Sequence, residues 1–98
     1  MAFAIYVAAN GFPTAVTAST VDQVVLTHNQ ARKGGVVYNN GGTNMFILLC
    51  RETAVSTAVF TAILTPNTYY QVPSNYIGEI RALWATTASG NAQVTELT

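Results

Sequence analysis

Short runs of β-branched and aromatic residues recur along this chain, and Gly, Pro or Asn separates each run from the next. The runs follow one another at intervals of about 8–12 residues, which is typical of antiparallel sandwiches and small barrels. No stretch of helical length shows a convincing 3.6-residue hydrophobic period. The pattern predicts an all-β fold: a single antiparallel β-sandwich (jelly-roll-like or a small barrel) of seven to eight short strands with an N-terminal extended arm.

Segment 32–50 carries the clearest local signal. Residues 36–38 and 45–50 are β-forming runs, and residues 39–42 between them read Asn-Asn-Gly-Gly. Asn-Gly and Gly-Gly tolerate the positive φ that type I′ turns require, so this segment predicts a β-hairpin. The run 45–50 is apolar on both faces, so one face should meet the core. The other face needs a second layer of the same chain or a neighbouring subunit, and we expect the neighbour.

The remaining strands are expected within 14–27, where Ser19-Thr20 marks a break, and at 58–64, 69–72, 76–87 and 92–97. In the longest run, alternation places Ile80, Ala82 and Trp84 on one face. Glu79 and Arg81 share the other face, where they could pair with each other or across strands as a structural or interface ion pair. The last two runs are expected to form a C-terminal hairpin, and the polar residues 28–33 a surface loop.

Residues 1–13 are expected to form an arm ahead of a sandwich domain at 14–98. Phe3, Ile5 and Val7 alternate with other residues at the period of a strand, and residues 10–13 (Asn-Gly-Phe-Pro) resemble a joint. The alternative is an ordinary first strand of the sandwich. The apolar stretch is shorter than the roughly 20 residues of a membrane span. It also lacks the positively charged start of a signal peptide.

The low charge is the most unusual feature of the composition. Charged residues make up 8% of the chain, against about 25% in ordinary soluble domains. We infer that other protein covers much of the surface, although a weakly charged Thr/Asn-rich domain is the alternative. The formal net charge is zero, so neither nucleic acid nor an anionic membrane is an expected partner. The single cysteine, Cys50, is expected to be a buried, inert thiol, as suits a reducing cytoplasm.

The sequence offers little catalytic chemistry. His28 lies in a polar loop, and the four carboxylates form no pair suited to acid–base catalysis. No nucleophile motif or metal-ligand spacing is found, so we expect no enzyme, catalytic residue, cofactor or metal. Tyr69, Tyr70 and Tyr76 could stack against a sugar, but packing in the core or an interface is the favoured interpretation.

Two segments carry a resemblance to a known family. Residues 29–41 place a basic pair before a strand, and residues 78–97 close the chain after a Pro-containing turn. Over residues 24–97 the chain resembles small β-sandwich structural proteins of tailed bacteriophages, of the capsid decoration (cement) type. The resemblance implies a non-enzymatic virion protein, often a homotrimer. Such a protein assembles in the host cytoplasm, binds the outside of the capsid and stabilises contacts between major capsid subunits.

Other functions stay open at this point. The chain could be a component of the tail, the baseplate or the head–tail connector, or else a carbohydrate-binding module. For the decoration role, we expect the arm and its joint to contact neighbouring subunits through Phe3, Ile5, Tyr6, Val7 and Phe12. Arg32 and Lys33 are expected to contact an acidic capsid surface; the alternative is that they only keep their loop solvated.

Overall fold

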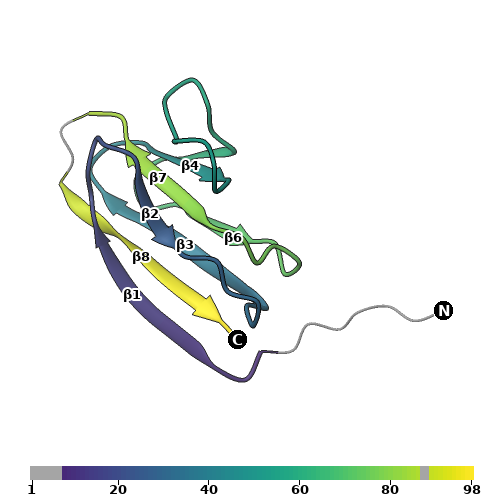
Figure 1. The fold of residues 1–98 in the computed structure, drawn as a ribbon. Helices are drawn as coiled ribbons and strands as arrows, with labels where there is room; N and C mark the ends of the chain where they lie inside the picture. Colours follow the sequence, from purple (N-terminus) through teal and green to yellow (C-terminus); the bar gives the residue numbers. More distant parts are fainter. Residues whose placement is uncertain (1–7, 87–88) are drawn as a thin grey trace.

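The computed structural model describes residues 8–86 and 89–98, which form eight β-strands and no helix (Figure 1). The strand bounds confirm a series of short strands, as follows: β1 Gly11–Thr17, β2 Gln23–Leu26, β3 Gly34–Gly41, β4 Met45–Leu49, β5 Ala62–Leu64, β6 Tyr69–Val72, β7 Ile80–Trp84 and β8 Gly90–Leu97. The residues expected to join an arm to the body, from Gly11 onward, belong instead to β1.

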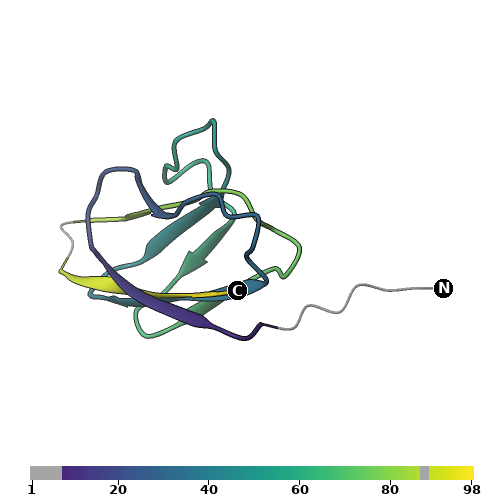
Figure 2. The same ribbon diagram turned by 60° about the horizontal axis from the view of Figure 1, so that its bottom comes forward.

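The strands form two packed antiparallel sheets. One sheet has the order β1-β8-β3-β6 and the other β2-β7-β4-β5, and Figure 2 shows them as two layers, with β1 and β8 side by side in the lower one. Successive strands alternate between the sheets except at β4–β5, which is the connectivity of an eight-stranded jelly roll. The predicted fold class is therefore confirmed.

The hairpin predicted within segment 32–50 is wrong. β3 and β4 lie in different sheets, and the intervening residues cross from one layer to the other. Among the described residues, positive φ occurs only at Gly34, Asn67 and Gly90, so the Asn-Asn-Gly-Gly sequence makes no type I′ turn. Asn39 shapes the crossing through its side chain, which accepts the Gly41 N–H at 2.9 Å and donates to the Thr43 carbonyl at 2.9 Å.

The C-terminal hairpin is wrong for the same topological reason, because β7 and β8 also belong to different sheets. β7 is shorter than its predicted run 76–87. The carbonyls of Tyr76 and Gly78 accept hydrogen bonds from the Arg32 guanidinium, which occupies them before a ladder can begin. The predicted strand 58–64 is shortened to β5, because residues 56–59 form a turn. In this turn the Ser56 hydroxyl accepts the N–H groups of Ala58 and Val59, and the Ser56 N–H donates to the Val59 carbonyl.

The core lies between the two inner sheet faces. Alternation along β7 directs Ile80, Ala82 and Trp84 inward, as predicted, and all three are fully buried. They pack with the inward side chains of the other strands, the largest of which are Met45, Ile47, Val37, Val72 and Val94. Asn39 is buried among them, and its side-chain amide oxygen, Oδ1, accepts the Trp84 indole N–H at 3.0 Å. A buried polar group of this kind is tolerated because its hydrogen bonds are satisfied.

A second apolar cluster lies on the outer face of β4 and β7. Phe46, Leu48 and Leu83 are buried there beneath residues 50–61, which return over the sheet and contribute Val55. Phe60 packs edge-on against Phe46 with ring centroids 5.2 Å apart. The second face of β4 is therefore covered by a layer of the same chain. The prediction that a neighbouring subunit covers this face of β4 is wrong.

Candidate interaction surface

Arg32 is buried at the end of the sandwich where β8 ends. Its Nε donates to the Glu96 carboxylate at 2.8 Å, and this side chain of Arg32 is 0% exposed. Its remaining N–H groups donate to the carbonyls of Gly78 at 2.7 Å, Tyr76 at 3.4 Å and Thr27. Arg32 thus joins three distant segments of the chain. The prediction that it lies in a surface loop is wrong, and its guanidinium has no free face for a capsid partner.

Arg81 forms the second ionic group, on the outer face of β7. It bonds Asp22 at 2.6 Å and Glu79 at 2.7 Å, which confirms the predicted Glu79–Arg81 pair. Asp22 also accepts the Val55 N–H at 2.9 Å, and Arg81 donates to the Arg51 carbonyl at 3.2 Å. Burial lowers the pKa of Arg81, but the charges of Asp22 and Glu79 outweigh it and raise that pKa overall. The group anchors residues 50–61 to the sheet.

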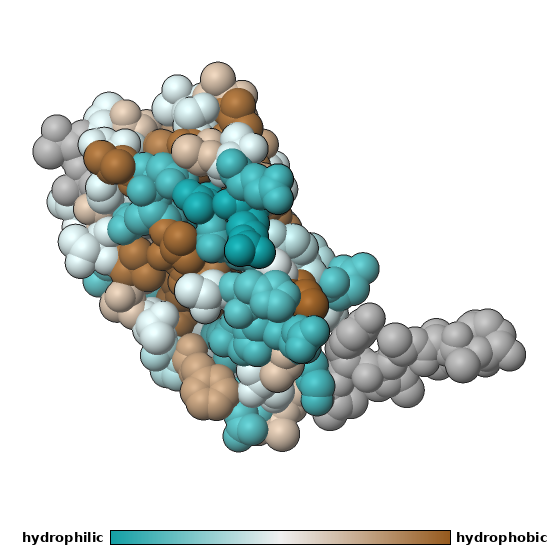
Figure 3. Space-filling view, in the orientation of Figure 1, coloured by the Kyte–Doolittle hydropathy of each residue, from teal (hydrophilic) through white to brown (hydrophobic). Residues whose placement is uncertain are grey.

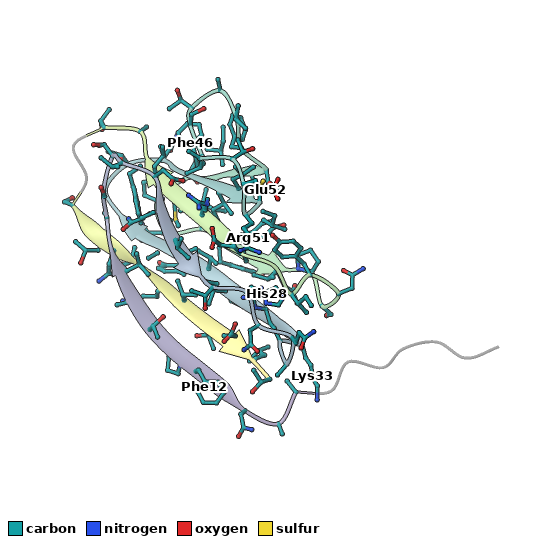
Figure 4. The ribbon with its side chains drawn as sticks, viewed as in Figure 1. Phe12, His28, Lys33, Phe46, Arg51 and Glu52 are labelled. Carbon is teal, nitrogen blue, oxygen red and sulfur yellow. The ribbon has the colours of Figure 1, made fainter. Side chains whose placement is uncertain are left out.

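These internal pairs leave very little charge for the surface. The chain has four basic and four acidic residues, all in the described part, and five of the eight take part in the two ionic groups. Lys33, Arg51 and Glu52 are the other three, and all are exposed. Figure 4 shows Lys33 near the end of β8, apart from Arg51 and Glu52 at the start of the β4–β5 connection.

The outer face of the β1-β8-β3-β6 sheet has no charged side chain. Strand register and alternation place one uncharged set of residues on it: Gly11, Pro13, Ala15 and Thr17 of β1, Asn91, Gln93, Thr95 and Leu97 of β8, Gly34, Val36, Tyr38 and Asn40 of β3, and Tyr69 and Gln71 of β6. Amide contacts order part of this face, since Asn91 accepts from Asn40 at 3.2 Å and from Gln93 at 2.9 Å. We call this set the uncharged face.

The three tyrosines considered for sugar stacking do not share a surface. Tyr70 and Tyr76 pack against the core, and the Tyr76 hydroxyl donates to the Glu79 carbonyl at 2.6 Å. Tyr69 is 66% exposed and lies opposite Tyr38 on the uncharged face. Packing, the favoured interpretation, holds for Tyr70 and Tyr76, whereas the exposed Tyr69 forms a pair with Tyr38. Strand pairing supplied this information, and no local sequence signal points to it.

Large apolar side chains are also exposed at scattered positions. On the side that Figure 3 shows, hydrophobic residues form several separate groups divided by hydrophilic ones. The exposed large apolar residues of the described chain are Phe12, Val21, Val24, Val59, Phe60, Ile63 and Tyr69. Phe12, at 53%, is the most exposed phenylalanine of the residues that the structure describes, and Figure 4 shows it on β1 at the border of the molecule. Of the predicted interface residues, Phe3, Ile5, Tyr6 and Val7 lie outside the described residues.

Cys50 is half-buried at the margin of the second apolar cluster, so it is more accessible than the expected buried thiol. Hydrogen bonds from the backbone N–H groups of Glu52 and Thr53 lower the pKa of its thiol. Within residues 8–86 and 89–98 no group of His, Cys, Asp and Glu is arranged to hold a metal ion. That same part of the chain shows no pocket, and it has no helix long and apolar enough to cross a membrane.

Comparison of the chain with protein-family models, with characterised proteins and with solved structures finds no match.

Proposed function

We propose that this chain is a non-enzymatic structural protein of a tailed-phage particle, which binds the outside of the capsid and stabilises contacts between major capsid subunits. The uncharged face is the observation that carries the proposal. Burying this face against protein removes no charged group from water. On a charged surface that desolvation costs on the order of several kcal/mol for each ion. The jelly roll is also a frequent fold of viral capsid domains, which is support by analogy alone.

The area of the uncharged face sets what it can do alone. Four strands spaced about 4.8 Å apart and about seven residues long cover roughly 500 Å². A standard interface buries about 800 Å² on each partner. The face therefore needs further contact area, and the nearest candidate is Phe12, which is exposed on the other side of the edge strand β1.

The proposed partners are the major capsid protein and further copies of this chain in a homotrimer, within the virion. Phe3, Ile5, Tyr6, Val7 and Phe12 are assigned to subunit contacts. Lys33 is the remaining basic candidate for an acidic capsid surface, because Arg32 is enclosed. Replacing Lys33 with Ala should weaken particle binding more at low salt than at high salt, since exposed charges are screened.

The test is to add one charge to the uncharged face. Gln93→Lys places an ammonium group at an exposed position in its centre, and Thr57→Lys places the same group on the β4–β5 connection. Both variants should fold with unchanged melting temperature. Gln93→Lys should lose co-sedimentation with phage particles that lack the protein, whereas Thr57→Lys should bind as the unaltered chain does. Normal binding by Gln93→Lys would refute the proposal.

A second candidate function rests on the Tyr38–Tyr69 pair. Gln93 lies opposite Tyr38, and Gln71 follows on the same face of β6. Aromatic faces beside side-chain amides, without charge, suit a neutral polysaccharide. A carbohydrate-binding role predicts that Tyr69→Ala abolishes retention on neutral glycan resins. Absence of glycan binding by the unaltered chain would eliminate this candidate.

A further inference from the structure

β1 presents the longest free edge among the described strands. It has seven residues and no charged side chain. The other edge strands are β2 and β6 with four residues each and β5 with three. β2 carries a register shift, and Pro73 follows β6. Proteins usually shorten, charge or interrupt an edge that stays exposed. β1 is neither short nor charged, and Pro13 is its single interruption, so β1 is the most open of these edges.

The hydrogen bonds of β1 show which groups are unused. The Asn10 carbonyl accepts from the Thr98 N–H at 2.9 Å, and the Ala18 N–H donates to the Gly90 carbonyl at 3.1 Å. The backbone N–H and C=O groups of the even-numbered residues therefore point toward β8. The backbone N–H and C=O groups of the odd-numbered residues point away from β8, toward the free edge. Gln23 occupies the Thr17 carbonyl at 2.9 Å, and Pro13 has no N–H. The open groups are the N–H groups of Gly11, Ala15 and Thr17 and the carbonyls of Gly11, Pro13 and Ala15.

Residues 9 and 10 pair with the end of the chain on the side of β1 that faces β8. The N–H groups of Ala9 and Asn10 both donate to the Thr98 carbonyl, at 2.8 and 3.0 Å, and Asn10 accepts from Thr98 in return. Two residues facing one is the pattern of a β-bulge, which continues the strand and reverses its alternation. Residues 9 and 10 are therefore held alongside the end of β8, and the chain passes from them directly into β1.

We propose that residues 2–8 of one copy of this chain bind antiparallel along the free edge of β1 in another copy. The inference rests on the self-association part of the proposed function, and is independent of capsid binding. Seven residues of the donor match the seven of β1, and the donor sequence Ala-Phe-Ala-Ile-Tyr-Val-Ala alternates at strand period. Strand addition of this kind takes its affinity from main-chain hydrogen bonds.

Side-chain chemistry selects the register. Ala4 of the donor lies opposite Ala15, and Tyr6 lies opposite Pro13, which needs to offer only its carbonyl. Phe3, Ile5 and Val7 then fall opposite the even-numbered residues of β1, on the face that carries the exposed Phe12. The row of Ala2, Ala4, Tyr6 and Ala8 meets the open backbone groups while the apolar row covers Phe12. The shift of one residue would reverse both faces.

The test is a mixed cysteine cross-link in a Cys50→Ser background. One protein carries Ala4→Cys and the other Ala15→Cys, so a disulfide between them joins separate copies. Opposed antiparallel residues have Cα atoms about 5.5 Å apart, within the usual disulfide range. Mild oxidation should convert most of the mixture to the heterodimer on non-reducing gels. Ala4→Cys mixed with Ala58→Cys, an exposed position on the β4–β5 connection, is the control and should give only traces.

Each result of the cross-linking experiment supports or refutes the binding of residues 2–8 to β1. A homodimer of Ala15→Cys alone would show β1 pairing with β1, which refutes the proposal. Equal cross-linking to Ala15→Cys and Ala58→Cys would show random collision and refute it too. The mass of the unaltered chain in solution shows whether the chain self-associates at all. It therefore separates a failure of the arm proposal from a failure of the self-association in the proposed function. An oligomer without the cross-link leaves self-association standing and rejects the arm, whereas a monomer rejects both.

Discussion

Replacing Arg32 with Met should destabilise the domain more than any other single change of charge. The substitution keeps a long apolar stem but removes a guanidinium whose side chain is 0% exposed. Glu96 then loses its charge partner at 2.8 Å, and the carbonyls of Gly78, Tyr76 and Thr27 lose their donor. The three carbonyls belong to the loops that follow β2 and precede β7, so the loss of Arg32 leaves them without this donor.

The expected loss is about 3–5 kcal/mol, the usual cost of removing one member of a buried ion pair. A domain of this kind has a total stability of about 5–15 kcal/mol, so the variant is near its folding limit. With a urea dependence of about 1.5 kcal/mol per molar, a loss of about 3 kcal/mol lowers the unfolding midpoint by about 2 M. Urea titration followed by tryptophan fluorescence reads this directly, because Trp84 is fully buried.

Lys33→Met is the matched control, since it removes the same charge from the adjacent, exposed position. Its stability should stay within about 0.5 kcal/mol of the unaltered chain. The double variant Arg32→Met/Glu96→Met should be more stable than the sum of the single losses predicts, because no buried charge is then left unpaired. Equal midpoints for Arg32→Met and Lys33→Met would refute the structural role of Arg32.

Three further predictions concern the core, the Gly90 position and the thiol. Asn39→Leu should cost about 3 kcal/mol or more in thermal unfolding, because it leaves the Trp84 indole N–H and three backbone groups unpaired; a loss below about 1 kcal/mol would contradict this. Gly90→Ala should cost about 2 kcal/mol or more, since Gly90 has φ 85° and a Cβ would overlap the Asn40 carbonyl; Gly11→Ala, with ordinary 3.6 Å contacts, is the control. Cys50 should react with iodoacetamide at a lower pH midpoint in the folded chain than in urea, because its folded pKa is lowered. By the same linkage, stability from Cys50 is present above the unfolded pKa and is lost as pH falls through the folded pKa; equal midpoints in both states would refute it.

The sequence predicted strands better than it predicted their partners. Alternation placed Ile80, Ala82 and Trp84 in the core correctly, because the period of two is a property of each strand alone. The Asn-Asn-Gly-Gly segment showed where the chain could turn but not toward which sheet. That choice depends on Asn39, whose side chain satisfies groups of the crossing and of the opposite sheet. Local turn chemistry contains no such information.

The interaction surface was predictable only in its character. Low charge indicated a surface suited to protein contact, and the structure sharpens this by placing five of eight charged residues in internal pairs. Arg32 resembled a surface residue because its neighbours in sequence are polar. Its acceptors come from residues 27, 76, 78 and 96, which only the folded topology brings together.

We propose above that the uncharged face of the β1-β8-β3-β6 sheet contacts other protein in a phage particle. A cryo-electron microscopy reconstruction of particles carrying the chain tests it most directly. We expect many copies on the outside of the capsid, with Gln93 and Tyr38 buried against a capsid subunit or another copy. Density confined to the tail, or a capsid-bound chain whose uncharged face is open to solvent, would contradict it.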